Sequence, residues 1–149
     1  QNYGIMLGRN TVMQATGTAI ITGNKMKNIV NHSMRIETAV DINLLFANNI
    51  MDGGLYGLFL NHASNVNGLS TIQVANNMAK NMTTDGFYCK PIGFEGIIFT
   101  GNTALGCALQ GFDVTVTNGV AKNNVSIGCT NADAFNGASA FISDNQDLA

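Results

Sequence analysis

The sequence predicts an all-β fold, a single-stranded parallel β-helix of about six coils, and two observations lead to this prediction. First, a short apolar run ends six times in a small or polar residue followed by asparagine, at Asn24, Asn49, Asn77, Asn102, Asn124 and Asn145. The spacings of 25, 28, 25, 22 and 21 residues are typical of repeats that bury their cores only against neighbouring repeats. Second, apolar and more polar residues alternate within each run, which is the period of a half-buried strand.

Corners are predicted on both sides of a short strand in each repeat. The residue before each asparagine is of a type that tolerates a positive φ angle: Gly23, Asn48, Asn76, Gly101, Asn123 and Asp144. Four residues after the asparagine, five repeats have another Asn or Gly: Asn28, Gly53, Asn81, Gly106 and Gly128. The chain is therefore expected to turn sharply at each asparagine and again after a short strand.

A further strand precedes the asparagine run in each repeat. Its pattern is glycine or a small residue, then apolar, any, apolar, and it begins at Gly4, Ser33, Gly57, Gly86, Gly111 and, weakly, Ala132. Each coil is therefore predicted to read strand, loop, strand, asparagine corner and short strand. Stacked coils would align the six asparagines in an internal ladder. Each amide is expected to bond to its neighbours in this ladder, because a buried amide without a partner costs about 1–3 kcal/mol.

Composition limits the organisation and the partners of the chain. Residues 1–149 suit a single domain, with 46 % hydrophobic and 11 % charged residues. The net charge of −2, without a basic stretch, argues against nucleic acid as a partner, and no apolar run is long enough for membrane insertion. Gly4 already begins one coil and Asp147 still lies within another. We therefore expect a segment of a longer chain, or a homotrimer whose partners protect the ends.

The repeat resembles the pectate-lyase-like right-handed parallel β-helix superfamily, in which a G-φ-x-φ strand leads to a φ-x-φ-x-x-N strand (φ, apolar). The resemblance extends from Gly4 to Asn145. It implies right-handed winding and, by comparison with bacteriophage tailspikes, lyases, C5-epimerases and hydrolases of the superfamily, a polysaccharide ligand. The segment 56–64 is faintly similar to the active-site run of alginate epimerases, but Phe59, Leu60 and Ala63 stand where that run has Asp, Pro and Asp.

The resemblance implies that the working face lies on the G-φ-x-φ strand, and alternation gives its outward positions. Neighbouring coils would then bring together a set of candidate glycan-binding residues: Arg35, Phe59, Asn61, His62, Tyr88 and Lys90. Aromatic rings pack against sugars, and amides and charged groups bind hydroxyls and carboxylates. The alternative is an unused outward face, with His62 and His32 as loop histidines bonded to the backbone.

Three carboxylates are the candidate catalytic residues, Glu37, Asp113 and, more weakly, Asp85. Glycoside hydrolysis needs two carboxyl groups about 5–9.5 Å apart. Glu37 and Asp113 belong to coils three apart, roughly 14 Å at the strand spacing, so they would not form such a pair alone. Asp85 could approach Asp113 through a loop. Whether the chain is an enzyme stays open; if it is, we expect a polysaccharide hydrolase or lyase.

The three cysteines are expected to be buried small hydrophobes. Cys107 and Cys129 should stack on adjacent coils, and Cys89 should lie on an inward column. No cofactor and no metal site is predicted, because CxxC spacing and a DxDxDG-like run are both missing.

The leading functional hypothesis is a polysaccharide-recognising β-helix of the bacteriophage tailspike type, a homotrimer located extracellularly or on the virion surface. One alternative is a secreted polysaccharide lyase, C5-epimerase or glycoside hydrolase. Another is a non-catalytic adhesin or structural spacer.

Overall fold

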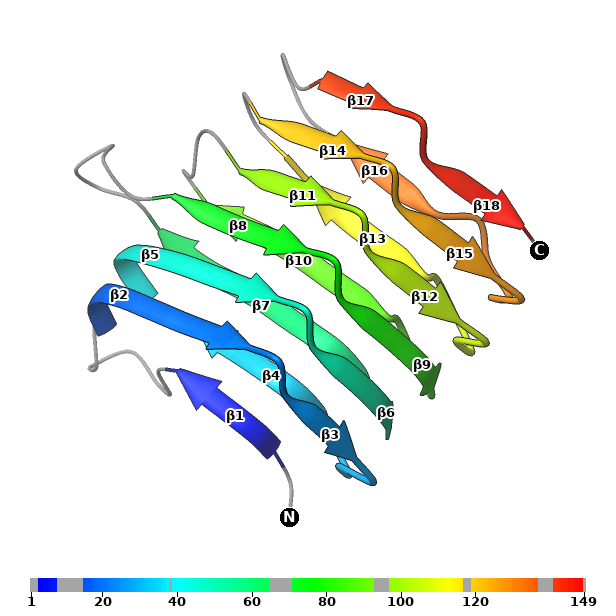
Figure 1. Ribbon diagram of the computed structural model, residues 1–149, viewed down its shortest axis with the longest axis horizontal. Helices are drawn as coiled ribbons and strands as arrows, with labels where there is room; N and C mark the ends of the chain where they lie inside the picture. Colours follow the sequence, from blue (N-terminus) through cyan, green and yellow to red (C-terminus); the bar gives the residue numbers. More distant parts are fainter. Residues whose placement is uncertain are drawn as a thin grey trace.

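The computed structural model describes residues 3–7, 15–37, 39–64, 71–92, 97–116, 119–136 and 141–148. These residues form eighteen strands and no helix, and hence no helix long and apolar enough to cross a membrane. Successive coils stack along one axis, with the two termini at opposite ends of the stack (Figure 1). The chain is a parallel β-helix, as the repeat predicts.

Every coil contributes one strand to each of three parallel sheets. The first sheet consists of β1 (Tyr3–Leu7), β4 (His32–Glu37), β7 (Tyr56–Ser64), β10 (Phe87–Ile92), β13 (Phe112–Thr115) and β16 (Ala134–Asn136). The second consists of β2 (Ala15–Thr22), β5 (Ala39–Ala47), β8 (Ile72–Ala75), β11 (Ile98–Thr100), β14 (Val120–Lys122) and β17 (Phe141–Ser143). The third consists of β3 (Lys25–Lys27), β6 (Ile50–Gly54), β9 (Met78–Met82), β12 (Thr103–Leu105), β15 (Val125–Ile127) and β18 (Gln146–Leu148).

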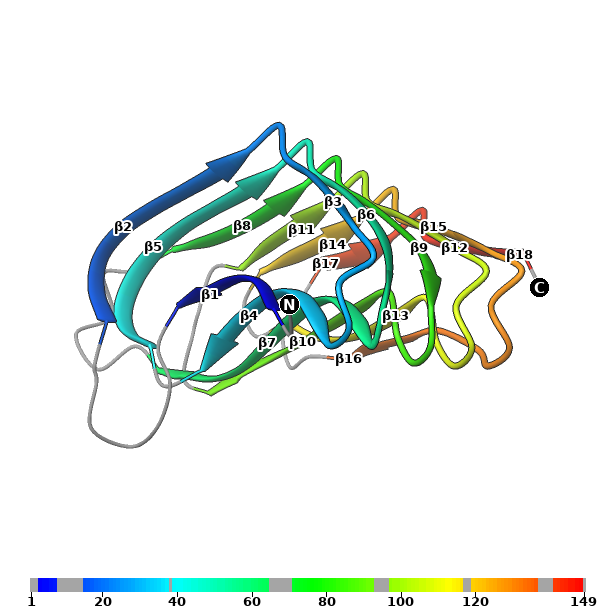
Figure 2. The same ribbon diagram turned by 90° about the horizontal axis from the view of Figure 1, so that it is seen from below.

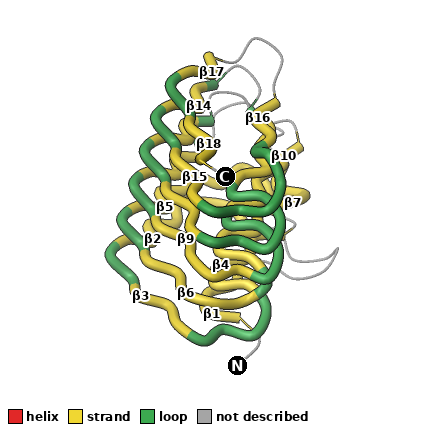
Figure 3. The backbone as a smooth tube through the Cα atoms, turned by 90° about the vertical axis from the view of Figure 1, so that its right-hand side faces the viewer, coloured by secondary structure: helices red, strands yellow, loops and turns green. Residues whose placement is uncertain are grey.

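The stack has four fully enclosed coils. The coils from β4–β6 to β13–β15 pair with a neighbour on both sides in all three sheets, whereas the described strands of the first and last coils pair on one side. The second and third sheets meet along a row of tight corners, which Figure 2 shows as successive bends of the ribbon. Figure 3 shows the same coils as a continuous winding tube.

The core fills the inside of the coils with apolar side chains from all three sheets. Phe46, Phe87, Phe99 and Phe112 are completely buried, and the rings of Phe87 and Phe112 stack with centroids 5.1 Å apart. Glycine lies beside the first residue of several first-sheet strands, because the backbone approaches the neighbouring coil closely there. A Cβ atom at Gly57 would lie 2.6 Å from the carbonyl oxygen of Gly86.

The six predicted asparagines form the internal ladder. Between successive amides Nδ2 donates to Oδ1, over distances of 2.9, 3.0, 3.0, 3.0 and 2.8 Å from Asn24 to Asn145. Each Oδ1 from Asn49 onward also accepts the backbone N–H of the preceding asparagine. The Nδ2 groups of the same residues donate in addition to a backbone carbonyl of the preceding coil. Four ladder members, Asn49 to Asn124, are buried, and these bonds are what make that burial tolerable.

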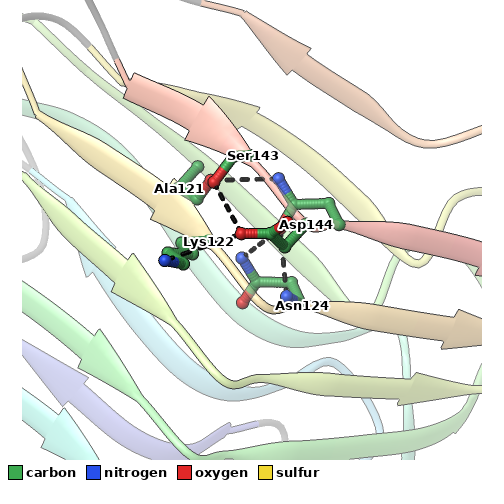
Figure 4. A network of polar contacts seen from close by, with 6 residues as sticks. Ala121, Lys122, Asn124, Ser143 and Asp144 are labelled. Atoms are coloured by element: carbon green, nitrogen blue, oxygen red, sulfur yellow. Dashed lines mark hydrogen bonds and ion pairs between the residues drawn. The ribbon is translucent and has the colours of Figure 1, made fainter.

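The corners have the predicted backbone geometry. The residue before each ladder asparagine has φ between 53° and 69°, and the five second-corner residues have φ between 55° and 79°. Glycine and asparagine adopt this left-handed conformation at the lowest cost, which explains their frequency in the sequence. At the last corner, Lys122, Ser143 and Asp144 form a small surface network beside Asn124 (Figure 4).

Candidate functional site

The outward positions of the first sheet line up across the coils as predicted. Arg35 pairs in register with Phe59, Phe59 with Tyr88, and Tyr88 with Asp113. In the next outward column Asn61 pairs with Lys90 on one side and with Glu37 on the other. The side chains of Glu37 and His62 lie outside the described residues. The remaining candidate residues therefore form one continuous strip across the coils.

Two stacked rings form the centre of the strip. The centroids of Phe59 and Tyr88 are 5.0 Å apart and their planes differ by 9°. The stacking direction follows the coil axis, so each ring uses a face to contact the other. A ligand lying on this strip would therefore meet ring edges and polar atoms, in contrast to the expected packing of sugars against ring faces.

A second aromatic column, which sequence reasoning missed, runs beside the first. His32 lies between Tyr3 and Tyr56, with ring centroids 5.5 and 5.1 Å away, and its ring meets Phe59 edge-on at 4.8 Å. His32 is buried within β4 and is not the expected loop histidine. These three residues each immediately precede the first residue of a G-φ-x-φ strand, and comparing that position across the repeats would have revealed the column.

Arg35 joins the two columns. Its Nη1 donates to the Tyr3 hydroxyl at 3.0 Å, and its guanidinium carbon lies 5.3 Å from the Tyr3 ring and 5.4 Å from the Phe59 ring. A planar cation between two rings is stabilised by both ring quadrupoles. Arg35 is therefore held against both rings by a hydrogen bond and two cation–π contacts.

An ion pair occupies the other end of the strip. Lys90 Nζ lies 2.6 Å from Asp113 Oδ2 and 4.9 Å from the Tyr88 ring centroid. The hydrogen bond to Asp113 raises the pKa of Lys90, although partial burial opposes this effect. The two charges neutralise each other, and together they offer both donors and acceptors to a polar ligand.

The candidate catalytic carboxylates occupy different environments. Asp113 is ion-paired with Lys90 on the first sheet. Asp85 is buried at the entry to β10, where Oδ1 accepts the backbone N–H of Gln110 at 3.0 Å. Burial raises the pKa of Asp85, and this hydrogen bond partly offsets the effect. The geometry gives Asp85 a structural role in linking two coils.

Two other aspartates, missed by sequence reasoning, do approach each other. Ser126 Oγ lies 2.7 Å from Asp133 Oδ2 and 2.9 Å from Asp147 Oδ1, and the Asp133 N–H donates to Asp147 Oδ2 at 3.1 Å. Burial, aided by the charge of Asp147, raises the pKa of Asp133. Both carboxyl groups line a hollow inside the last coil, together with Phe135, Asn145 and Gln146. The signal was available, because Asp133 occupies the repeat position that Phe112 fills one coil earlier.

The cysteines have the predicted places. Cys89 is fully buried between Leu60 and Val114 in register, and the backbone N–H of Cys107 lies 3.4 Å from the Cys129 sulfur of the next coil. Burial raises the pKa values of Cys89 and Cys107 to about 12, which keeps both thiols protonated and unreactive. The described part of the chain contains no group of three or more His, Cys, Asp or Glu side chains that could bind a metal.

Comparisons of the chain with protein-family models, with curated proteins and with solved structures found no match. The function is therefore inferred from the residues of the strip.

Proposed function

We propose that this chain binds a polysaccharide along the outward strip of its first sheet, as a recognition module of the kind found in pectate-lyase-like β-helices and bacteriophage tailspikes. Its place would then be extracellular or on a virion surface. The observation that carries the proposal is the continuous aromatic and polar strip from Arg35 to Asp113, which follows the coil axis across four coils. The second column, Tyr3, His32 and Tyr56, extends this surface to the first coil. A long, repetitive ligand suits a long, repetitive surface.

The chemistry of the strip favours a hydroxyl-rich ligand. Tyr56, Tyr88 and Asn61 provide neutral polar groups at partly exposed positions, and the Lys90–Asp113 pair provides a donor and an acceptor side by side. Preformed rings and a clamped arginine reduce the entropy lost on binding. Binding is favoured over cleavage because the described carboxylate of this strip, Asp113, is already neutralised by Lys90.

The test is a binding assay with a panel of bacterial surface polysaccharides, combined with measurement of glycan chain length after incubation. For a polysaccharide that binds, Phe59→Ala and Tyr88→Ala should each weaken affinity about tenfold, as the loss of a central aromatic contact does. Ile127→Ala, on the exposed face of the third sheet, is the control and should bind like the unmodified chain.

Two results would contradict the proposal. Unchanged affinity in both aromatic variants would show that the strip is not the binding surface. Shortening of the glycan would show catalysis and favour a hydrolase or lyase instead.

A further inference from the structure

The last coil replaces part of its apolar interior with two carboxyl groups that face a single hydroxyl group. Asp147 is in register with Ser126, and Ser126 with Ala104, along one inward column of the third sheet. Asp133 takes the inward position that Phe112 fills one coil earlier. Ser126 is completely buried, and both carboxyl groups line the hollow of the last coil. These polar groups therefore need partners inside the fold.

The hydrogen-bond donors around the two carboxyl groups are one proton short. Asp133 Oδ1 accepts the backbone N–H of Phe112 at 2.9 Å, and Asp147 Oδ2 accepts the backbone N–H of Asp133 at 3.1 Å. The other two carboxyl oxygens, Asp133 Oδ2 and Asp147 Oδ1, lie 2.7 and 2.9 Å from Ser126 Oγ. A hydroxyl group has one proton and donates it to one of these oxygens. The second contact is a hydrogen bond only if a carboxyl group supplies the other proton.

Asp133 is the better place for that proton. It is less exposed than Asp147. Burial, aided by the charge of Asp147, raises the pKa of Asp133, although the hydrogen bonds that its ionised form accepts from Ser126 and Phe112 oppose this effect. A neutral Asp133 donates from Oδ2 to Ser126 Oγ, and Ser126 then donates to Asp147 Oδ1. Every donor in this relay has an acceptor.

No cation among the described residues compensates the charge of the relay. On β13, Asp113 lies on the outward side and is paired with Lys90 at 2.6 Å. At the corner before β18, Asp144 is paired with Lys122 at 3.5 Å. β15 and β17 have no titratable side chain, and the buried Cys129 is the next titratable group along the chain from β15. Titration of the relay therefore changes the net charge inside the last coil.

We propose that Asp133, Ser126 and Asp147 hold one proton between them and that this proton fastens the last coil, which opens from the stack as the pH rises. The strands of this coil pair with a neighbour on one side only, so the relay is an additional tie between β15, β18 and the start of β16. Loss of the proton leaves two carboxylates facing one hydroxyl group, and like charges repel. The closed coil binds the proton more tightly than the open coil. Closure is therefore complete at low pH and weakens as the pH rises through the titration of the closed coil.

Hydrogen–deuterium exchange of the full chain, followed by NMR, tests this opening residue by residue. Gln146 in the last coil donates its backbone N–H to a carbonyl of the preceding coil at 2.8 Å, and Thr103 makes the equivalent bond of 2.8 Å in an enclosed coil. The protection factor of Gln146 relative to that of Thr103 should fall at least about threefold as the pH is raised from about 3 through the titration of the relay. Protection factors are corrected for the intrinsic pH dependence of exchange, so this ratio reports the opening of the last coil. A ratio that does not change with pH would overturn the proposal.

Three variants assign the effect to the relay. Asp133→Asn provides an amide that donates to Ser126 Oγ at every pH, so the ratio should stay high and lose its pH dependence. Ser126→Ala, which matches Ala104 of the preceding coil, removes the link, so the ratio should be low even at the lowest pH. Asp144→Asn is the matched control, because it removes an exposed carboxylate of the same coil outside the relay, and it should keep the pH dependence of the unmodified chain. Unchanged pH dependence in Asp133→Asn or Ser126→Ala, or its loss in Asp144→Asn, would contradict the proposal.

Discussion

The asparagine ladder gives a prediction whose magnitude follows from its bonds. Asn102 makes four side-chain bonds of 3.0 Å: Oδ1 accepts the backbone N–H and Nδ2 of Asn77, and Nδ2 donates to Asn124 Oδ1 and to the Val74 carbonyl. Asn102→Ala removes all four. At about 1 kcal/mol for each bond, plus a further penalty of about 1 kcal/mol for the unpaired buried N–H of Asn77, the loss is about 5 kcal/mol.

Asn24 is the matched control, because it occupies the first position of the same ladder. Its Nδ2 donates to Asn49 Oδ1 at 2.9 Å and to the Thr22 carbonyl at 3.1 Å, in a partly exposed setting. Water can replace these partners, so Asn24→Ala should cost only about 1 kcal/mol. The comparison separates the effect of burial from that of losing an asparagine.

Urea unfolding followed by circular dichroism measures both free energies of unfolding. For a chain of this length, the Asn102→Ala loss corresponds to a fall in Tm of about 10–20 °C, and the Asn24→Ala loss to about 2–4 °C. If both variants were destabilised to the same extent, the buried ladder would not be a main source of stability. The reasoning from hydrogen-bond satisfaction would then be refuted.

Three further predictions concern single positions. Burial raises the pKa of Asp133, so the folded chain binds this proton more tightly than the unfolded chain, and the contribution of Asp133 to stability falls as pH rises above about 4. Asp133→Asn should therefore gain stability relative to the unmodified chain as the pH is raised from about 3 through the titration of this carboxyl group. Thermal unfolding at several pH values would show no such trend if the reasoning were wrong. Gly57→Ala places a Cβ 2.6 Å from the Gly86 carbonyl oxygen and should cost about 1–3 kcal/mol in chemical unfolding. Asn76 has φ 54° and an exposed side chain, so Asn76→Gly should change stability by less than about 0.5 kcal/mol, whereas Asn76→Val should cost more than about 1 kcal/mol.

The candidate site shows where sequence reasoning succeeds and where it stops. Alternation and repeat spacing placed Phe59, Tyr88, Lys90 and Asp113 on one face, because parallel in-register coils put equivalent positions side by side. The same reasoning could not give ring orientation, and the stacking of Phe59 on Tyr88 turned their faces toward each other and away from a ligand. It also missed the place of His32, whose burial depends on tyrosines from two neighbouring coils.

The carboxylates show the same contrast between what the sequence predicts and what only the structure reveals. Asp85 and Asp113 were both visible as candidates in the sequence, but their partners come from other coils: a backbone N–H for Asp85 and an ammonium group for Asp113. The pairing of Asp133 with Asp147 through Ser126 joins a residue just before β16 of the first sheet to two residues of the third sheet. Such contacts depend on how the coil closes, which repeat spacing alone does not specify.

By itself, the sequence determined the parallel β-helix, the ladder from Asn24 to Asn145 and the corners, because these follow from local backbone preference and from a period that stacks identical positions. Only the tertiary structure decided which polar groups are paired and which ring faces are covered. Those properties depend on contacts across the coil and between sheets, where side chains of unrelated repeat positions meet.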